Sequence, residues 1–360
     1  MKIKELSVKN FTVFEEAKFE FSPGLNIFIG ENATGKTHLL KLMYSTLKVL
    51  RDRADDDFPD PDGLERLQVH LSDKLARVFR PEKQRVGRLV RRGRGRNHAE
   101  VTIAYDTAEI AFKLTTLGRI ELTTVTPPKP PSCLFIPSRE MLSVFPGFIA
   151  AYEGRELEFS DTEYDLCMAL SASSLRGPRA EMAAKLLAPL ESAVRRKVVL
   201  KDGRFYLVAS GEGSMEAHLV AEGLRKVATV LHLIGNGLIA KNSVLFWDEP
   251  EANLNPRLIT IIGEVILQLA AAGVQIFIAT HDFLLTDQLS LAAEYQTEEG
   301  KAARPRFFGL SRPKSTAAVE VESGNGLAAI GKNSILDEYA AQQDRERVLF
   351  YGDTAEKGTT

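Results

Sequence analysis

The sequence predicts an α/β fold, in which helices cover a mixed, largely parallel β-sheet. Three short runs are mainly apolar, as buried strands are, and they lie at residues 25–29, 243–247 and 274–278. The first two runs are each followed by a stretch in which apolar residues recur at helical spacing. Because a strand, a helix and a strand in succession bring the two strands together in parallel, this order predicts a parallel sheet with helical layers.

The composition indicates an ordinary globular protein. The chain has 360 residues, of which 44% are apolar and 26% charged. No apolar run reaches the roughly 18 residues that suggest a membrane span, and the N-terminus lacks the apolar core of a signal peptide. The two cysteines, Cys133 and Cys167, support neither a disulfide framework nor a cysteine zinc site. We therefore expect a cytoplasmic protein with no membrane partner.

Residues 1–149 are expected to form the N-terminal part of the main domain. Alternating apolar residues predict a first strand that begins at Ile3 and a second around Phe19 and Phe21. Behind the strand at 25–29, one apolar face predicts a helix, formed by Leu39, Leu40, Leu42, Met43 and Leu47. After a polar break at 51–66, further strands are predicted near 101–105, 108–114, 119–124 and 133–136.

A short, mainly helical lobe is expected to interrupt this domain at residues 150–204. Residues 159–197 have helical apolar spacing, and the insertion is too short for a long coiled-coil arm. The C-terminal part, residues 205–360, returns to alternating helix and strand. Its predicted helices lie at 220–234, 258–270 and 332–342, and two terminal strands are predicted at 307–310 and 317–321.

A glycine-rich turn between the strand at 25–29 and the next helix predicts a phosphate site. Residues 30–37, GENATGKT, match G-x-x-x-x-G-K-[ST] at every fixed position. The glycines let backbone amides approach phosphate oxygens, Lys36 supplies a charge to the β- and γ-phosphates, and Thr37 can bind Mg²⁺. The predicted ATP-binding residues are Gly30, Glu31, Asn32, Ala33, Thr34, Gly35, Lys36, Thr37 and His38.

Two adjacent acids end the strand at 243–247. We expect Asp248 to hold the same Mg²⁺ as Thr37, through water, because a carboxylate at the end of a strand serves this purpose in P-loop proteins. Glu249 lies next to it, outside the metal role, and is suited to orient or polarise the attacking water. The sequence therefore predicts Mg²⁺-dependent ATP hydrolysis.

The residues that follow these acids resemble a known family. Residues 248–256, DEPEANLNP, resemble the Walker-B motif and D-loop of ABC-type ATPases of the RecF, OLD and SMC kind. This resemblance implies an ABC-ATPase-like P-loop head and a D-loop formed by Asn253, Leu254 and Asn255. It also implies that His281, directly after the strand at 274–279, is the switch histidine that senses the γ-phosphate. The implied catalytic residues are then Lys36, Glu249 and His281.

The resemblance also implies a signature element that reaches ATP bound by a second subunit. Ala221, Glu222 and Gly223 have the expected position, at the start of a helix before the Walker-B strand. Ala221 stands where the family usually has a serine, so a hydrogen bond worth about 1–3 kcal/mol at a charged group would be missing. Ser210-Gly211 is a competing candidate. We expect a homo-oligomer with composite ATP sites.

The resemblance also implies a Q-loop and a stretch that borders the adenine. Arg139 and Glu140 occupy the place of the Q-loop, but the usual glutamine is absent. Asn10 and Phe11 occupy the stretch that borders the adenine in related heads, although Phe11 would serve equally well in the core.

A strongly basic segment is the main sequence indication of a partner. Residues 74–96 contain ten basic residues and one acid, a local charge of +9, while the rest of the chain carries −11. Glycines favour a hairpin or loop that could grip DNA or RNA phosphates without reading sequence. Alternatively, the arginines pair with acids of this subunit or its partner, or face nucleotide phosphate. The candidates are Arg85, Arg88, Arg91, Arg92, Arg94 and Arg96.

The sequence as a whole predicts a compact ATPase head that couples its nucleotide state to an oligomer or partner state. Its resemblance to bacterial "AAA family" ATPases implies a component of antiphage defence that works with a separately encoded effector, such as a nuclease or toxin. One alternative is a RecF-like repair ATPase that binds DNA directly. Another is an ATP-gated scaffold with little hydrolysis.

Overall fold

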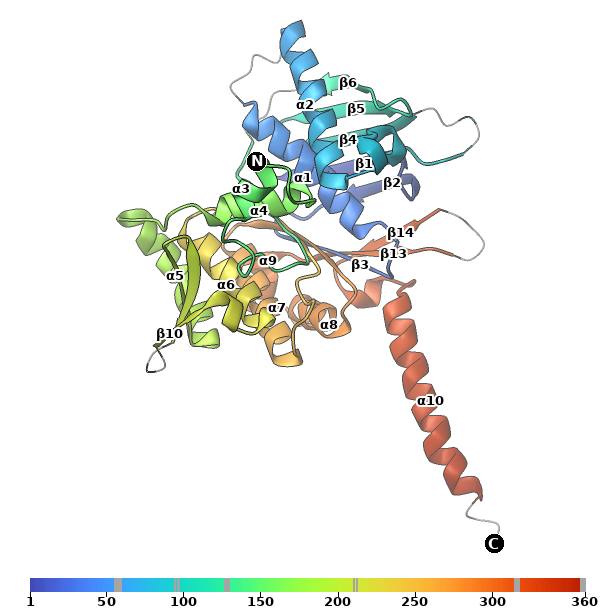
Figure 1. The fold of residues 1–360 in the computed structure, drawn as a ribbon. Helices are drawn as coiled ribbons and strands as arrows, with labels where there is room; N and C mark the ends of the chain where they lie inside the picture. The colour runs from blue at the N-terminus through green and yellow to red at the C-terminus, as the bar shows by residue number, and fades with distance from the viewer. Residues whose placement is uncertain are drawn as a thin grey trace.

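A six-stranded sheet forms the centre of the computed structural model, which describes residues 1–54, 60–93, 95, 98–125, 130–209, 211, 213–313 and 318–356 (Figure 1). The strand order is β14-β13-β3-β12-β11-β7. Five of these strands are parallel and β14 is antiparallel, which confirms the predicted mixed, largely parallel sheet. Their bounds are β3 Leu25–Gly30, β7 Cys133–Ile136, β11 Val244–Asp248, β12 Gln275–Thr280, β13 Arg306–Ser311 and β14 Glu320–Gly324.

The predicted N-terminal and middle strands form a second sheet rather than extending the first. This sheet is antiparallel, with the order β2-β1-β4-β5-β6. Helices α1 (Lys36–Asp52) and α2 (Pro61–Phe79) accompany it in the upper part of Figure 1. Its strands are β1 Ile3–Phe11, β2 Phe14–Glu20, β4 His98–Tyr105, β5 Glu109–Thr115 and β6 Ile120–Val125.

The central strands are buried on both faces, which explains their continuous apolar character. One face belongs to the same core as α1 and the antiparallel sheet; there Tyr44 of α1 packs on Phe135 and Phe246, with ring centroids 5.4 and 6.0 Å away. Alternate residues such as Ile27 and Trp247 point into the other core. Helices of that second core are α6 (Glu222–Gly235), α7 (Pro256–Ala271), α8 (Phe283–Glu294) and α9 (Glu298–Ala303).

The helical region in the middle of the chain is broken into pieces. The predicted helical stretch at 159–197 is two helices, α4 (Asp161–Leu170) and α5 (Pro178–Val194), because Gly177 with a φ of 65° and Pro178 start the second one anew. Short α3 (Phe148–Glu153) precedes them. A small antiparallel sheet follows, formed by β8 Lys197–Lys201, β9 Arg204–Ala209 and β10 Gly213–Glu216. The lobe boundaries at 150 and 204 stay a prediction.

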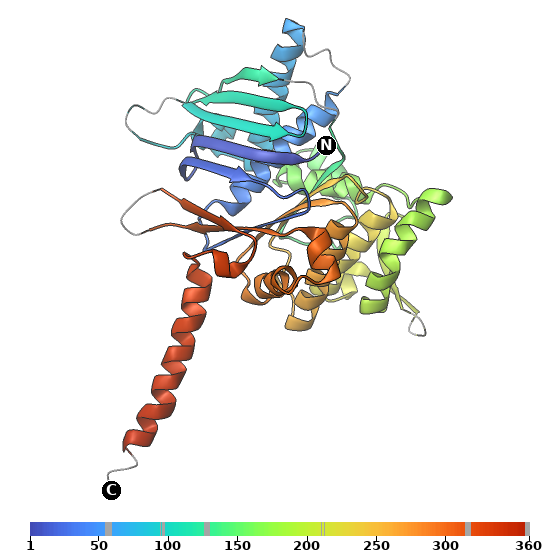
Figure 2. The ribbon, with the colours of Figure 1, turned by 180° about the vertical axis from the view of Figure 1, so that it is seen from behind.

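The C-terminal helix is longer than expected and leaves the body. Instead of residues 332–342, α10 covers Ser334–Glu356 and projects downward as an arm in Figures 1 and 2. The second terminal strand is Glu320–Gly324 rather than 317–321, and Ala317 lies outside the described residues. Among the helices in the described ranges, none is long and apolar enough to cross a membrane.

Candidate nucleotide-binding site

Three central strands end at the same edge of the sheet and bring the predicted site residues together. Because β3, β11 and β12 are parallel, Gly30, Asp248 and Thr280 lie at their carboxyl ends. Ligands of open α/β sheets bind outside this edge. The glycine-rich loop, the Asp-Glu pair and His281 therefore surround one location.

Both fixed glycines of the loop are required by close packing. Gly35 caps α1 with a φ of 92°, and an added Cβ would lie 2.6 Å from Val13 Cγ2. A Cβ on Gly30 would lie 2.2 Å from the carbonyl oxygen of Leu310. The loop is thus a tight backbone cradle at a helix N-terminus, the arrangement that suits phosphate.

Lys36 is folded over this cradle. Its Nζ donates hydrogen bonds to the carbonyl oxygens of Gly30, at 2.6 Å, and Glu31, at 2.9 Å. Burial lowers the pKa of Lys36, and the carboxylates of Glu249 and Asp248 oppose this shift. The ammonium group is therefore held at the position where phosphate oxygens would replace the carbonyl partners.

Thr37 and Asp248 form a pair of oxygen ligands suited to a hard cation. Thr37 Oγ1 donates a hydrogen bond of 2.8 Å to Asp248 Oδ1. Burial raises the pKa of Asp248 to about 6, and the Thr37 hydroxyl partly offsets that rise. A buried carboxylate that lacks a full counter-charge is stabilised by a cation, and Mg²⁺ prefers oxygen ligands with remaining positions filled by water and phosphate. The residues present therefore fit Mg²⁺.

Glu249 and His281 face each other beyond the metal pair. Glu249 has a φ of 46°, and its N–H donates to the Ala279 carbonyl oxygen at 2.8 Å, which turns the chain away from the strand direction. His281 Nδ1 lies 3.5 Å from Glu249 Oε1. Both side chains are partly exposed, so they can reach a ligand outside the sheet edge.

Glu251 is a site residue that sequence reasoning did not assign. It is buried and accepts hydrogen bonds from Thr280 Oγ1, at 2.7 Å, and the backbone N–H of His281, at 3.2 Å. Burial raises its pKa, and its Oε2 has no hydrogen-bond partner within the described part of the chain. Glu251 thus fixes the start of the His281 segment. Its position in the DEPE motif was the available signal.

The predicted signature and D-loop residues lie together on one surface. Ala221 is exposed and precedes α6 without a side-chain cap, while Gly223 packs so closely that an added Cβ would lie 2.9 Å from Leu254. Asn253 Nδ2 donates to Glu222 Oε1 at 2.8 Å. Asn255 caps α7 by accepting from the N–H of Leu258 at 3.0 Å.

The two Q-loop candidates lie in different surroundings. Glu140 is buried and accepts from Arg225 Nε at 2.7 Å, which ties it to the signature helix. Arg139 is exposed, with its guanidinium 5.1 Å from the ring centre of Phe159. Contact of either residue with nucleotide stays a prediction.

Three buried polar atoms without partners lie beside the loop. They are Thr12 Oγ1, His38 Nδ1 and Arg91 Nε, each unpaired within the described ranges. Arg91 Nη1 donates to the carbonyl oxygen of Val13 at 2.6 Å, and Val13 is the residue that Gly35 contacts. Burial lowers the pKa of His38 to about 4, so its imidazole is neutral. Buried polar groups normally have partners, so these atoms fit a polar ligand such as a nucleotide.

Phe11 and Asn10 support this side of the site indirectly. Phe11 is fully buried in the core and packs edge-on against Phe79, which in turn lies 5.7 Å from the His38 ring. Asn10 accepts the backbone N–H of Arg91 at 2.8 Å. The structure thus makes Phe11 a core residue.

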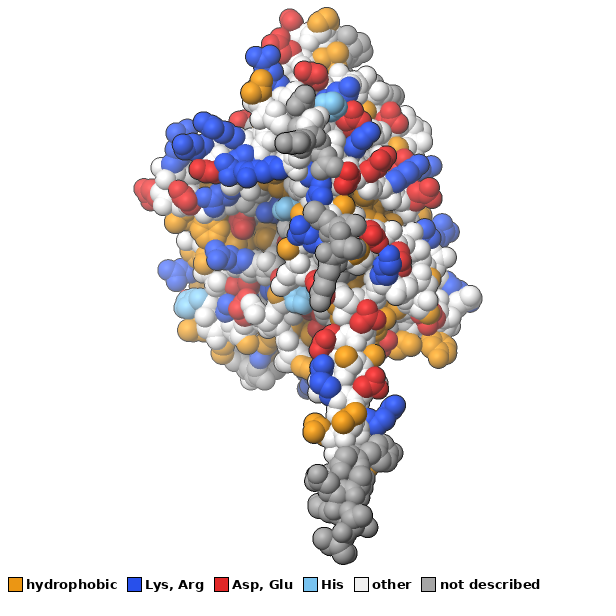
Figure 3. All heavy atoms as spheres, turned by 90° about the vertical axis from the view of Figure 1, so that its right-hand side faces the viewer, with side chains coloured by type: hydrophobic (Ala, Val, Ile, Leu, Met, Phe, Trp, Pro, Cys, Tyr) orange, Lys and Arg blue, Asp and Glu red, His pale blue; other side chains and the backbone are white. Residues whose placement is uncertain are grey.

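In its described residues, the basic segment forms a loop rather than an α-helix beyond the end of α2, as its glycines suggested. It comprises the end of α2 and two short 3₁₀ turns, Glu82–Gln84 and Val86–Leu89. Lys74 and Arg88 are engaged within the chain, the latter 2.5 Å from Glu82. Arg85, Arg88 and Arg92 are exposed, and Arg94 and Arg96 lie outside the described residues. Figure 3 shows Lys and Arg side chains gathered above a hollow partly lined by hydrophobic side chains.

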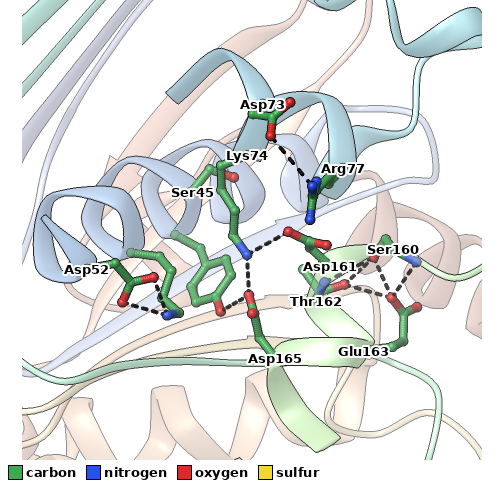
Figure 4. A network of polar contacts seen from close by, with 12 residues as sticks. Ser45, Asp52, Asp73, Lys74, Arg77, Ser160, Asp161, Thr162, Glu163 and Asp165 are labelled. Atoms are coloured by element: carbon green, nitrogen blue, oxygen red, sulfur yellow. Dashed lines mark hydrogen bonds and ion pairs between the residues drawn. The ribbon is translucent and has the colours of Figure 1, made fainter. Parts of the chain in front are cut away.

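A buried ionic network connects the helix of the phosphate loop to the middle region (Figure 4). Lys74 of α2 lies 2.9 Å from Asp161 and 2.5 Å from Asp165, both on α4. Tyr44 of α1 donates to Asp165 at 2.6 Å, and Tyr152 of α3 donates to Asp161 at 2.7 Å. Four helices are therefore joined through two carboxylates.

The fold and this site resemble those of AAA/RecF/SMC-like ATPases, and comparisons with known proteins find partial matches to the same group. A family model described as an AAA ATPase domain matches residues 1–114. A second AAA domain model, whose description refers to an AbiEii toxin and a type IV TA system, matches residues 158–287.

Curated relatives and solved structures point to the same group. The DNA replication and repair protein RecF of Streptococcus equi is 38% identical over 90 residues, which is 21% of this chain and 24% of that protein. RecF of Streptococcus agalactiae is 54% identical over 44 residues, 12% of each chain. These matches span about a quarter or less of the RecF proteins.

The structural likeness extends over most of the chain. An SMC head bound to the C-winged helix domain of ScpA has a TM-score of 0.55 and 14% identity, and covers 90% of this chain and 98% of that one. The SMC head domain from Thermotoga maritima has a TM-score of 0.50 and 12% identity, and covers 90% and 99%. The fold is therefore SMC head-like, and the findings together confirm the resemblance to RecF/SMC-like P-loop ATPases.

Proposed function

We propose that this protein binds ATP with Mg²⁺ and hydrolyses it to ADP and phosphate. The observation that carries this proposal is the 2.8 Å pair of Thr37 and Asp248 beside the Lys36 ammonium group, at the carboxyl edge of the sheet. Bound Mg²⁺ would neutralise charge on the phosphates. Thr37 and Asp248 would hold it, and Lys36 would exchange its carbonyl partners for phosphate oxygens.

Glu249 and His281 are proposed to act on the attacking water. Glu249 directly follows the proposed metal carboxylate, and its own partly exposed carboxylate would orient the attacking water. His281, whose Nδ1 lies 3.5 Å from Glu249 Oε1, is proposed to sense the γ-phosphate. Glu251 would keep His281 in place through the hydrogen bond to its backbone N–H.

The site is proposed to be completed by a second copy of the chain. Ala221 and Asn253 are exposed, and the hydrogen bond from Asn253 Nδ2 to Glu222 Oε1 joins the predicted signature to the predicted D-loop. A ligand held between two subunits links nucleotide state to assembly state, because it stabilises only the paired form. We therefore propose a homo-oligomer that responds to ATP.

The biological role is proposed to be antiphage defence in the cytoplasm, together with a separate effector protein such as a nuclease or toxin. The description of the AAA domain matched at 158–287 supports this role. The partial likeness to RecF supports the alternative of a repair ATPase that binds DNA directly, for which the exposed Arg85 and Arg92 could contact phosphates. The absence of a hydroxyl at Ala221 supports the further alternative of an ATP-gated scaffold with little hydrolysis.

Two substitutions separate binding from hydrolysis. Lys36→Ala should abolish ATP binding, because it removes the charge that the phosphates require. Glu249→Gln should bind ATP normally but turn over at least about 100-fold more slowly, because the water loses its orienting carboxylate. Binding is measured by calorimetry and turnover by phosphate release.

Glu264→Gln is a matched control, because this acid lies on α7, away from the strand ends, and should leave both quantities unchanged. Wild-type protein that binds ATP and never releases phosphate, alone or with DNA and partner, would reject hydrolysis and favour the scaffold.

A further inference from the structure

The projecting helix α10 begins beside the proposed phosphate site. Ser334 and Asp337, in its first turn, line a cavity of about 420 Å³ together with Glu31 and Thr34 of the glycine-rich loop. The helix then leaves the body (Figures 1 and 2). With a rise of about 1.5 Å per residue, residue 349 lies roughly 22 Å along the helix from Ser334. Helix α10 therefore extends from the glycine-rich loop to residues that lie far from the body of the protein.

The far part of this arm carries large apolar side chains in an exposed setting. Val348, Leu349 and Phe350 are 70, 74 and 68% exposed. Three adjacent exposed apolar residues on a projecting helix are typical of an interaction surface. We name them the arm tip.

A large cavity elsewhere in the fold has a partly apolar wall that could receive the apolar side chains of the arm tip. Its volume is about 1090 Å³, and it lies between α5, β8, β9, α6 and α7. Apolar side chains in its wall include Val194, Val208, Leu224, Leu258 and Ile261. We name it the α5–α7 cavity.

The cavity wall is basic, whereas the arm taken as a whole is acidic, with Glu338 and Asp344 in ion pairs with Arg345 and Arg347. The cavity wall contains Arg195, Arg196, Lys197 and Arg257 with one acid, Glu191. Residues 334–350 of the arm contain four acids and two arginines. Opposite charges around an apolar contact favour encounter and fix its orientation.

The arm and the cavity of one chain are not neighbours. In Figures 1 and 2, which are views from opposite sides, α10 and the α5–β10 end lie on opposite sides of the lower half. The cavity wall also contains Ala221 and Asn255, which belong to the surface proposed to meet the phosphate loop of a second subunit. In the proposed pair, this surface of one subunit covers the phosphate loop of the second subunit. The cavity of the first subunit would then lie on the side where α10 of the second subunit begins.

We propose that α10 of one subunit docks its arm tip in the α5–α7 cavity of a second copy of this chain. This inference rests on the proposed composite site and adds a contact away from the nucleotide. The arm would add a contact between the subunits. This contact would compensate for the hydrogen bond to ATP that Ala221, which has no hydroxyl, cannot make across the interface. Reciprocal arms of two subunits would form an isologous interface.

Site-directed crosslinking tests the contact. Two differently tagged chains are prepared in the Glu249→Gln background, one with Leu349→Cys and one with Ile261→Cys. Their own cysteines, Cys133 and Cys167, are buried and contribute no background. Mixed with ATP and oxidised, they should form a disulfide between the two tags, and much less with ADP. The matched control replaces Ile261→Cys by Val69→Cys, which is 60% exposed on α2 and should not crosslink.

A second variant measures the contribution of the contact. Leu349→Asp should weaken ATP-driven dimerisation about tenfold or more, because a charge replaces an apolar group that becomes buried, while ATP affinity of the separate subunits is unchanged. Dimerisation is followed by light scattering over a range of concentrations. If Glu249→Gln dimerises with ATP but neither the crosslink nor the Leu349→Asp effect appears, the arm contact is wrong and the composite site stands. If no ATP-driven dimer forms at all, both proposals are rejected.

Discussion

Asp248 shows how single residues of this site store unfavourable free energy in the absence of ligand. Its carboxyl group is buried at the end of β11, with the Thr37 hydroxyl at 2.8 Å as a neutral partner. Burial raises its pKa to about 6, so ionising it at neutral pH opposes folding. A cation bound beside Asp248 would offset the cost of ionising this carboxyl group. The negative charge would therefore be stabilised only when the cation is bound.

The pH dependence of stability tests this description. The unfolded chain loses the Asp248 proton near pH 4 and the folded chain near pH 6, so stability decreases as pH rises through this window. Asp248→Asn keeps an oxygen for Thr37 and removes the charge. Without nucleotide, it should raise the free energy of unfolding at pH 7.5 by up to about 3 kcal/mol, with the gain vanishing near pH 4.

Urea unfolding at both pH values measures this difference. Asp344→Asn, on the exposed part of α10, is the control and should change stability little at either pH. An equal effect of Asp248→Asn at pH 4 and 7.5 would show that the carboxyl group is not strained in the folded protein.

Sequence motifs of fixed spacing predict those candidate site residues that lie close together along the chain. Lys36, Thr37 and Asp248 were found because loop and strand motifs have fixed spacing, and the structure brings them together. The location of Thr12 and Arg91 beside the loop depends on contacts between distant segments, such as the hydrogen bond from Arg91 to Val13. No local pattern encodes that contact, so sequence reasoning could not find it.

At the scale of elements, the Lys74 network joins α1, α2 and α4. Lys74 is buried between Asp161 and Asp165, and these two carboxylates raise its pKa against the opposing effect of burial. Tyr44, which donates to Asp165, is on the same helix as Thr37. A shift of α1 on nucleotide binding would therefore reach α4 through this network.

Removing the buried lysine should destabilise the protein strongly. Lys74→Met leaves Asp161 and Asp165 buried without a counter-charge, which typically costs about 3–5 kcal/mol. Arg77→Met is a matched control one turn later on α2, because Arg77 and Asp73 form an exposed pair at 3.6 Å that is worth little. Chemical unfolding of the two variants should differ by several kcal/mol. Similar stabilities would mean that the network does not hold these helices together.

The location of individual strands was predicted well, because it depends on a local pattern of apolar residues. The pairing of strands that are far apart in the sequence was not predicted. Apolar runs located β3, β11 and β12 because these strands are buried on both faces. The same pattern could not show that β1 pairs with β4, more than 90 residues later, in a separate sheet. The break between α4 and α5 was missed although the sequence signals it, because the polar run at 171–174 and the Gly177-Pro178 pair interrupt the apolar spacing.

At the scale of the whole molecule, the loop and the signature surface are expected to serve different sites. The loop, Asp248 and His281 lie at the carboxyl edge of the sheet, whereas Ala221 and Asn253 form a surface with the start of α6 and the D-loop. In the proposed assembly, the surface with Ala221 and Asn253 of each subunit completes the phosphate-loop site of the other subunit. The arm on α10 would strengthen the same assembly.

Mixing two inactive variants tests this central claim most directly. Lys36→Ala removes the loop charge, and Ala221→Asp places a negative charge at an exposed helix start, where it should repel the partner's γ-phosphate without disturbing the fold. Each variant alone should be inactive. In an equal mixture, half of the dimers contain both chains, and each of these has one intact site, so roughly a quarter of wild-type phosphate release should return. A mixture no more active than its components, or full activity of Ala221→Asp alone, would contradict the composite site.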